Sequence, residues 1–133
     1  MAEAKAHLKN YRQSPRKVRL VASSVRGKSV KDALDILTFV PNRAALPLQK
    51  LVASAAANAQ ALNLNAEKLT IKELTVDEGP TLYRRRPRSR GMANPIRKRT
   101  SHVTVIIAET EPKQKKSKKV SKANTAPEAS EAK

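Results

Sequence analysis

The chain has 133 residues, enough for one domain with a modest core, and it contains no cysteine. This composition excludes a disulfide framework, a Cys-ligated zinc site and a thiol nucleophile. The 28 basic residues outnumber the 11 acidic ones and leave a net charge of +17, which predicts a polyanionic partner, with nucleic acid ahead of an anionic membrane surface.

Membrane insertion and export are both disfavoured. No apolar run reaches the length of about 18 residues that spans a bilayer. The N-terminal segment MAEAKAHLKNY lacks the apolar centre of a secretory signal. A reducing, cytosol-like compartment fits the absence of cysteine. The aromatic residues are only Tyr11, Phe39 and Tyr83, too few for the base-stacking platforms of single-strand-binding proteins.

The first predicted elements are a weak strand and a helix. The strand rests on alternating apolar residues and is placed at a sheet edge: Ala4, Ala6 and Leu8. The helix begins at Ser14-Pro15, because the serine side chain accepts from a free backbone N–H and proline suits the first helical position. Gly27 ends it. Its buried stripe follows helical spacing: Val18, Val21, Ala22 and Val25.

The same helix carries a basic stripe. Arg16, Arg19 and Arg26 fall within roughly 80° of one another at 100° per residue. Acidic side chains are absent between Lys5 and Lys31. We therefore interpret this stripe as a phosphate-binding face rather than an ordinary solvated one.

Two further helices are predicted. Ser29 and Asp32 resemble a capping box with Asp in place of Glu, and Pro41 closes the helix that they begin. Its buried stripe is Val30, Ala33, Leu34 and Leu37. A longer helix is predicted from about Arg43 to Leu62, with a late start or a kink at Pro47. Its inward side chains are Leu48, Leu51, Val52, Ala55, Ala59 and Leu62.

The pattern then changes to strands. Leu69 and Ile71 alternate in one phase and Leu74 and Val76 in the other, which predicts a bulge near Glu73. A second strand is predicted to pair with it in antiparallel orientation. Its inward residues are Val103, Val105 and Ile107, with Ile106 on the other face.

Between these strands lies TLYRRRPRSRGMANPIRKRT, residues 81–100, with seven arginines, one lysine and no acidic side chain. About ten residues in each arm, at about 3.3 Å each, predict a hairpin of roughly 30 Å. Pro87 and Pro95 stiffen the arms and Gly91 permits the turn. The hairpin has no apolar face of its own. Arginine forks onto phosphate with two hydrogen bonds, so we predict ordered contacts with RNA.

Catalytic interpretations are weak. His7 and His102 are isolated histidines on predicted strands, which favours packing or RNA-facing roles. Asp77-Glu78, before Gly79-Pro80, is the only adjacent acidic pair, and we predict a capped turn at the base of the hairpin rather than a magnesium site. The chain contains no Walker, dinucleotide-binding, zincin or nucleophile-elbow motif. We predict no enzymatic activity, no metal and no cofactor.

The last segment, residues 111–133, has seven basic and three acidic residues and one valine. Such a composition cannot bury enough apolar surface to offset its ordering entropy. We predict a disordered, lysine-rich tail beyond a globular domain of residues 1–110, with the arginine-rich hairpin at residues 79–101. The tail is either a solubilising segment or a loose phosphate tether.

Two long stretches resemble the universal, bacterial-type large-subunit ribosomal protein family L-twenty-two (L22). They are SPRKVRLVASSVRGKSVKDALDIL, residues 14–37, and VDEGPTLYRRRPRSRGMANPIRKRTSHVTVII, residues 76–107. The resemblance implies an α+β fold of three helices on a small three-stranded antiparallel sheet, with a long protruding β-hairpin. It implies a structural component of the large subunit that binds its rRNA, takes part in assembly and lines the nascent-peptide exit tunnel with the hairpin.

The resemblance also implies particular contacts. The partners would be large-subunit rRNA, neighbouring proteins at the tunnel exit and the nascent polypeptide, with the protein a monomer in the ribosome and no membrane partner. The rRNA contacts would fall on Arg12, Ser14, Arg16, Lys17, Arg19, Arg26, Tyr83, Arg84, Arg85, Arg86, Arg88, Arg90, Arg97, Lys98 and Arg99. The tip that lines the tunnel would comprise Arg88, Ser89, Arg90, Gly91, Met92 and Ala93. Met92 and Pro95 stand where tips of the family often carry basic residues.

A free nucleic-acid-binding protein, of the RNA-chaperone or nucleoid type, is the alternative. Net charge alone does not separate the two. The long asymmetric arginine hairpin favours the ribosomal interpretation, because a free binder gains nothing from such a projection.

Overall fold

A computed structural model describes residues 3–109 of the chain. In chain order the elements are β1 (Glu3–Tyr11), α1 (Pro15–Val25), α2 (Val30–Phe39), α3 (Ala45–Ala61), β2 (Leu69–Glu78), β3 (Leu82–Pro87), β4 (Ala93–Lys98) and β5 (Ser101–Glu109). Short 3₁₀ turns lie at Ala66–Lys68 and Ser89–Gly91. The tail predicted at residues 111–133 lies outside the described residues.

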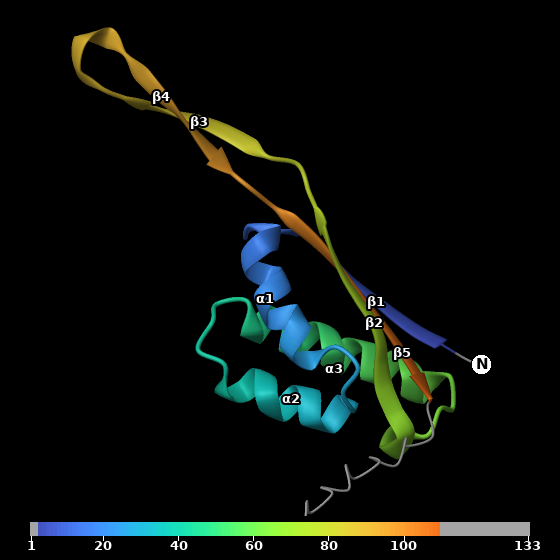
Figure 1. Ribbon diagram of the computed structural model, residues 1–133. Helices are drawn as coiled ribbons and strands as arrows, with labels where there is room; N and C mark the ends of the chain where they lie inside the picture. The colour runs from blue at the N-terminus through green and yellow to red at the C-terminus, as the bar shows by residue number, and fades with distance from the viewer. Residues whose placement is uncertain (1–2, 110–133) are drawn as a thin grey trace, which may run out of the picture.

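The body is a three-stranded antiparallel sheet with the order β1-β5-β2, and the three helices lie on one side of it (Figure 1). Helix α3 packs on β1 and β5, α1 packs on β2, and α2 packs mainly on α3. Strands β3 and β4 form a separate two-stranded ladder that projects far from the body. The predicted α+β fold is confirmed.

The core lies between the sheet and the helices, and strand periodicity determines which side chains enter it. In β5, Val103, Val105 and Ile107 are buried while the intervening residues are partly exposed. In β2 the buried phase changes, and the register shifts between Ile71 and Glu73. The predicted bulge is therefore confirmed. It turns both apolar pairs of β2 toward the helices.

Helix α1 begins at Pro15 and ends before Gly27, as predicted, but its N-terminal cap differs from the prediction. The Ser14 side chain makes no capping hydrogen bond. Its backbone carbonyl instead accepts from the N–H groups of Lys17 and Val18. At α2 the Ser29 side chain does accept from the Asp32 N–H, at 3.1 Å, as predicted. Of these two helices, therefore, only α2 has an N-terminal side-chain cap.

Helix α3 begins at Ala45, so the predicted late start is confirmed and Pro47 falls in the first turn, where a missing N–H costs nothing. The prediction that Leu62 faces inward is wrong, because its side chain is 55% exposed. The helix ends at Ala61, and the chain turns away at Asn63 with a φ of 59°. The period that placed Leu62 inside no longer applies there.

The sheet and the projecting ladder meet at an interruption, between the Glu78–Ser101 pair and the Leu82–Lys98 pair. Across it the Gly79 N–H donates to the Thr100 carbonyl (3.0 Å), and Thr100 Oγ1 donates to the Pro80 carbonyl (2.7 Å). The predicted capped turn is wrong. Asp77 and Glu78 are the last residues of β2, paired with β5, because the strands run on into the projection.

Gly79 is needed at this interruption for space. A Cβ there would lie 2.5 Å from Thr100 Oγ1 and 3.1 Å from His102 Nε2. We expect Gly79→Ala to lower the free energy of unfolding by about 1–3 kcal/mol through overpacking, measured by urea denaturation. Thr100→Ala removes the nearest atom, so Gly79→Ala should cost less in that background. Equal costs in both backgrounds would show that the Thr100 contact does not matter.

Candidate nucleic-acid interface

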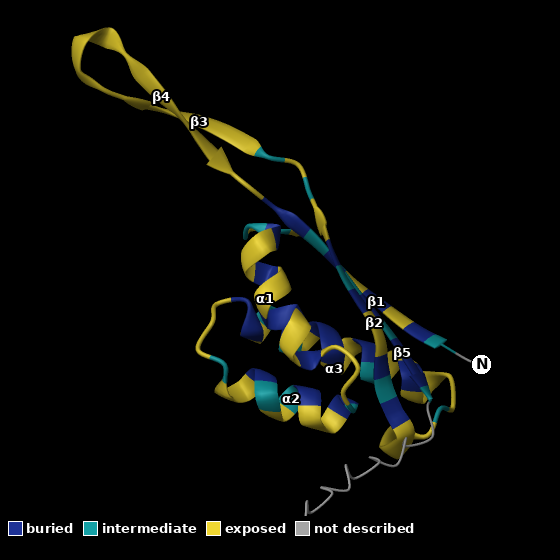
Figure 2. Cartoon of the chain, viewed as in Figure 1, coloured by how far each residue is buried: buried dark blue, intermediate teal, exposed yellow. Residues whose placement is uncertain are grey.

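We call the projection formed by β3, the tip and β4 the finger, residues 82–99. Every one of its residues is exposed (Figure 2). At the tip the Arg88 N–H donates to the Met92 carbonyl, at 2.8 Å. The turn uses two left-handed residues, Arg90 at a φ of 56° and Gly91 at 69°. Gly91 was predicted in this role, whereas a left-handed arginine beside it was not.

Both faces of the finger are cationic. Strand residues alternate between faces, and cross-strand partners share one. One face carries Arg84, Arg86 and Lys98, and the other carries Arg85 and Arg97 beside Tyr83. Among the described residues, the only hydrogen bond that a finger guanidinium donates is from Arg84 to the neighbouring Tyr83 carbonyl, at 2.7 Å. These arginines can therefore bind anions on two sides, which suits a finger surrounded by polyanion.

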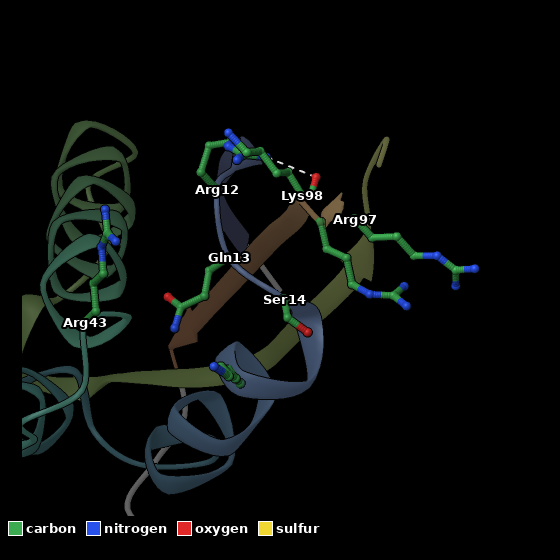
Figure 3. Close-up of a pocket in the computed structure, with 8 residues that line it drawn as sticks. Arg12, Gln13, Ser14, Arg43, Arg97 and Lys98 are labelled. Atoms are coloured by element: carbon green, nitrogen blue, oxygen red, sulfur yellow. Dashed lines mark hydrogen bonds between the residues drawn. The ribbon is translucent and has the colours of Figure 1, made fainter. Parts of the chain in front are cut away.

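A cleft opens where the finger joins the body. It has a volume of about 620 Å³. We call it the root cleft and define it by its lining: Arg12, Gln13, Ser14, Lys17, Arg43, Arg97, Lys98 and Arg99. Six of these eight residues are basic and none is acidic. Figure 3 shows Arg43 across the opening from Arg97 and Lys98, with Gln13 and Ser14 between them.

Loop contacts hold the cleft in shape. The Tyr11 hydroxyl lies 2.7 Å from Gln13 Oε1 and 3.2 Å from the Arg43 carbonyl, so it ties the segment before α1 to the loop before α3. Burial raises the pKa of Tyr11 above its ordinary value, while the Arg43 charge acts in the opposite direction. The phenol therefore stays a neutral donor at physiological pH. At the neighbouring turn the Asn10 N–H donates to His102 Nδ1, at 3.1 Å.

One hydrogen bond joins the body to the finger across the root cleft. Arg12 Nη1 donates to the Lys98 carbonyl at 3.0 Å (Figure 3). Within residues 3–109, four of the basic side chains of the cleft make no hydrogen bond or ion pair: Lys17, Arg43, Arg97 and Arg99. They line the root cleft without a counter-charge among the lining residues.

The arginines of α1 divide into two groups. Arg19 donates through Nε and Nη2 to the Val76 carbonyl, at 3.0 and 2.8 Å, and Arg26 donates to the Leu74 carbonyl, at 2.7 Å. These carbonyls belong to β2, which is an edge strand of the sheet. The loop after α1 bonds the same strand through Gly27 N–H to the Ile71 carbonyl. The two arginines therefore satisfy an edge that would otherwise be open to pairing.

We expect Arg19→Ala and Arg26→Ala each to lower the free energy of unfolding by about 1 kcal/mol, because each leaves a strand carbonyl without its charged donor. Arg16→Ala is the matched control on the same helix: Arg16 is exposed, and its side chain makes no hydrogen bond or ion pair with the described residues. Its thermal midpoint should stay at the wild-type value. Equal destabilisation by all three substitutions would contradict the assigned edge role.

The structure brings Arg12, Ser14, Lys17 and the three basic residues at 97–99 together in the root cleft, as members of one site. It places the other predicted hairpin residues along the finger and Arg16 on the exposed side of α1. Gln13 and Arg43 were missed. The sequence pattern gives Arg43 only as the start of a helix, and no local pattern reveals that the loop before α3 reaches the finger root.

The two histidines make structural contacts. His7 Nδ1 lies 3.0 Å from Thr104 Oγ1 on the neighbouring strand, and His102 holds the turn at Asn10. Within residues 3–109 no group of three or more His, Cys, Asp or Glu side chains is placed to hold a metal ion. Over the same range, no helix has the length and apolarity needed to cross a membrane.

Comparison with known proteins decides the family. The family model described as ribosomal protein L22p/L17e matches residues 6–108. The chain belongs to this family. Two curated relatives, both called large ribosomal subunit protein uL22, come from Desulfitobacterium hafniense, strains DSM 10664 / DCB-2 and Y51. Each is 51% identical over 110 residues, covering 82% of this chain and 96% of the relative.

Membership of the L22 family makes this protein a structural, non-enzymatic component of the large ribosomal subunit, located in the ribosome in the cytoplasm. The matched residues include α1, the root cleft and the whole finger. The resemblance stated from the sequence is therefore confirmed at the level of the family.

Proposed function

We propose that the protein binds large-subunit rRNA through three connected surfaces: the exposed side of α1, the root cleft and both faces of the finger. The contacts are those predicted from the sequence, with Arg43 and Gln13 added. Arg19 and Arg26 already donate to β2, so only part of each guanidinium remains for phosphate. Residues 1–110 act as one RNA-binding domain that includes the hairpin at residues 79–101.

The observation that carries this proposal is the two-sided charge of the finger. A surface-binding element needs cations on one face, whereas this ladder presents them on both and buries none of its residues. Phosphate on each side would supply the surroundings that an isolated hairpin lacks. The finger therefore threads into rRNA and helps to order it during assembly.

The tip follows from this placement. Residues Arg88, Ser89, Arg90, Gly91, Met92 and Ala93 form the end farthest from the body (Figure 1). We propose that they line the nascent-peptide exit tunnel, with the nascent polypeptide as a passing partner. The body remains near the tunnel exit as a monomer, beside neighbouring large-subunit proteins.

Sedimentation tests the proposal against a free RNA-chaperone or nucleoid role. Lysate of cells that carry a tagged full-length protein is sedimented at moderate salt. The run is made once with intact ribosomes and once after the two subunits have been dissociated without nuclease, so that the rRNA stays intact. We expect the protein to follow the large subunit and to give crosslinks to its rRNA from residue 88 or 97. Recovery in the unsedimented fraction, or with DNA, would overturn the ribosomal RNA assignment in favour of the alternative.

A further inference from the structure

The root cleft has two halves of like charge. The body contributes Arg12, Lys17 and Arg43, and the end of the finger contributes Arg97, Lys98 and Arg99. These six cations come from separated parts of the chain and converge on a single opening without a carboxylate in its lining. Because all six side chains carry the same sign of charge, the two halves of the cleft repel each other.

Little in the protein opposes this repulsion. The ladder between the sheet and the finger is interrupted from Gly79 to Thr81 on one arm and from Arg99 to Thr100 on the other. Two hydrogen bonds hold the interruption, and one more, from Arg12 to the Lys98 carbonyl, crosses the cleft. No apolar side chain of the finger is buried against the body. The direction of the finger therefore depends on a small number of hydrogen bonds at its root.

We infer that the root cleft binds an RNA backbone phosphate, and that this binding fixes the direction of the finger relative to the body. The inference rests on the proposed rRNA binding and assigns it a conformational role. An anion between the halves replaces their repulsion with two sets of attractions. Guanidinium groups from both sides can fork onto the same phosphodiester, which a single lysine-rich surface cannot do.

The side chains that line the root cleft favour a phosphate group of an RNA backbone over an apolar peptide segment. Of the eight lining residues, six are cations, and four of those six are arginines. The other two, Gln13 and Ser14, offer neutral hydrogen-bond donors. None of the eight lining residues has an apolar side chain that could anchor an apolar peptide segment. A backbone with successive phosphates can also continue from the cleft onto Arg84 and Arg86 along one face of the finger. The cleft is thus the point where RNA joins the two parts of the protein.

Distance measurement between the body and the tip tests this. The chain has no cysteine, so Ser89→Cys at the tip and Ala57→Cys on the exposed side of α3 give two unique spin-label positions in the full-length protein. The probe is a ten-nucleotide oligouridylate, compared with the same oligomer carrying an uncharged methylphosphonate backbone. We expect the charged probe to narrow the distance distribution and the uncharged one to leave it unchanged.

The decisive variant is Lys17→Ala with Arg43→Ala, which removes two cleft cations of the body and leaves the Arg12 hydrogen bond. Its charge-matched control is Lys50→Ala with Lys68→Ala, both exposed and outside the cleft. The cleft variant should bind the oligouridylate roughly tenfold more weakly than the control. Its salt slope should fall by about 1 to 2, one for each lost phosphate contact. In this cleft variant the oligouridylate should no longer narrow the distribution of distances between the two spin labels.

Unchanged narrowing in the cleft variant, or binding by the wild type without any narrowing, would overturn the inference. Neither result would contradict the proposed function, because the protein would still bind RNA. A wild type that follows the large subunit in sedimentation while its cleft variant behaves like the control would likewise overturn only the cleft. Failure of the wild type to associate with the large subunit would overturn the proposed function itself.

Discussion

RNA binding by the isolated protein should fall steeply with salt, with a log–log slope larger in magnitude than about 4 on large-subunit rRNA. Each phosphate neutralised by Lys or Arg releases counterions, at about 0.7 per contact on single strands, so this slope corresponds to about six contacts. The structure offers more cations than that: six in the root cleft and five more arginines along the finger and its tip. Between 50 and 200 mM salt, affinity should drop roughly 250-fold or more.

Filter binding or fluorescence anisotropy at four or more salt concentrations measures this slope. The Lys50→Ala, Lys68→Ala variant serves as the control, because it lowers the net charge without touching the finger or the cleft. Its slope should stay close to that of the wild type. A slope near 1 for the wild type would contradict a multi-phosphate interface, and equal losses in the control would show that net charge alone determines binding.

Local signals predicted the fold well, because apolar spacing reports directly which side of each element meets the core. The phase change between Ile71 and Leu74 is one example: only an extra residue in the strand places both in the interior, and the register shift lies there. The finger was predictable for the opposite reason. A cationic stretch without apolar periodicity has no place in a core and must project.

Contacts between distant segments were not predictable from local pattern. Arg19 and Arg26 looked like an RNA-facing stripe, since helical spacing reveals a shared face but not that β2 passes beside it. Arg43 lies 54 positions before Arg97 in the chain, and only the packing of α3 on the sheet brings its loop to the finger root. The side-chain cap predicted at Ser14 was also wrong: the residue type permits the bond, but the side chain makes none, and Ser14 lines the root cleft.

Deleting Leu82 to Arg99 and joining the strands with a tight Asn-Gly turn should barely change thermal stability. All of the deleted residues are exposed, and the sheet, the three helices and the Gly79–Thr100 hydrogen bond remain. We expect the thermal midpoint to stay within a few degrees of the wild type. It can even rise, because the deletion removes eight like charges from one ribbon.

The deletion should separate incorporation from tunnel function. Arg12, Arg16 and Lys17, which we propose bind rRNA phosphate, remain on the body, so large subunits should contain the shortened protein at close to normal occupancy. Drugs that lodge in the tunnel and nascent chains that pause there should respond differently. Removing only Leu82, Tyr83 and Arg84 at the base of one arm should shift the finger, because it alters the register with β4, and should act similarly.

Three measurements decide the outcome: the melting temperature of the purified proteins, their occupancy in isolated large subunits, and the response to a tunnel-binding drug or a stalling peptide. Arg16→Ala, which leaves the finger intact, is the control for loss of an RNA contact on the body. A body that unfolds when the finger is deleted would place the finger in the folding unit. Three unchanged readouts would show that the finger is not a tunnel element. We expect a normal melting temperature and normal occupancy with an altered tunnel response. The core between sheet and helices contains none of the finger's residues, so the body should remain folded without it, and the proposed tunnel contacts should be lost.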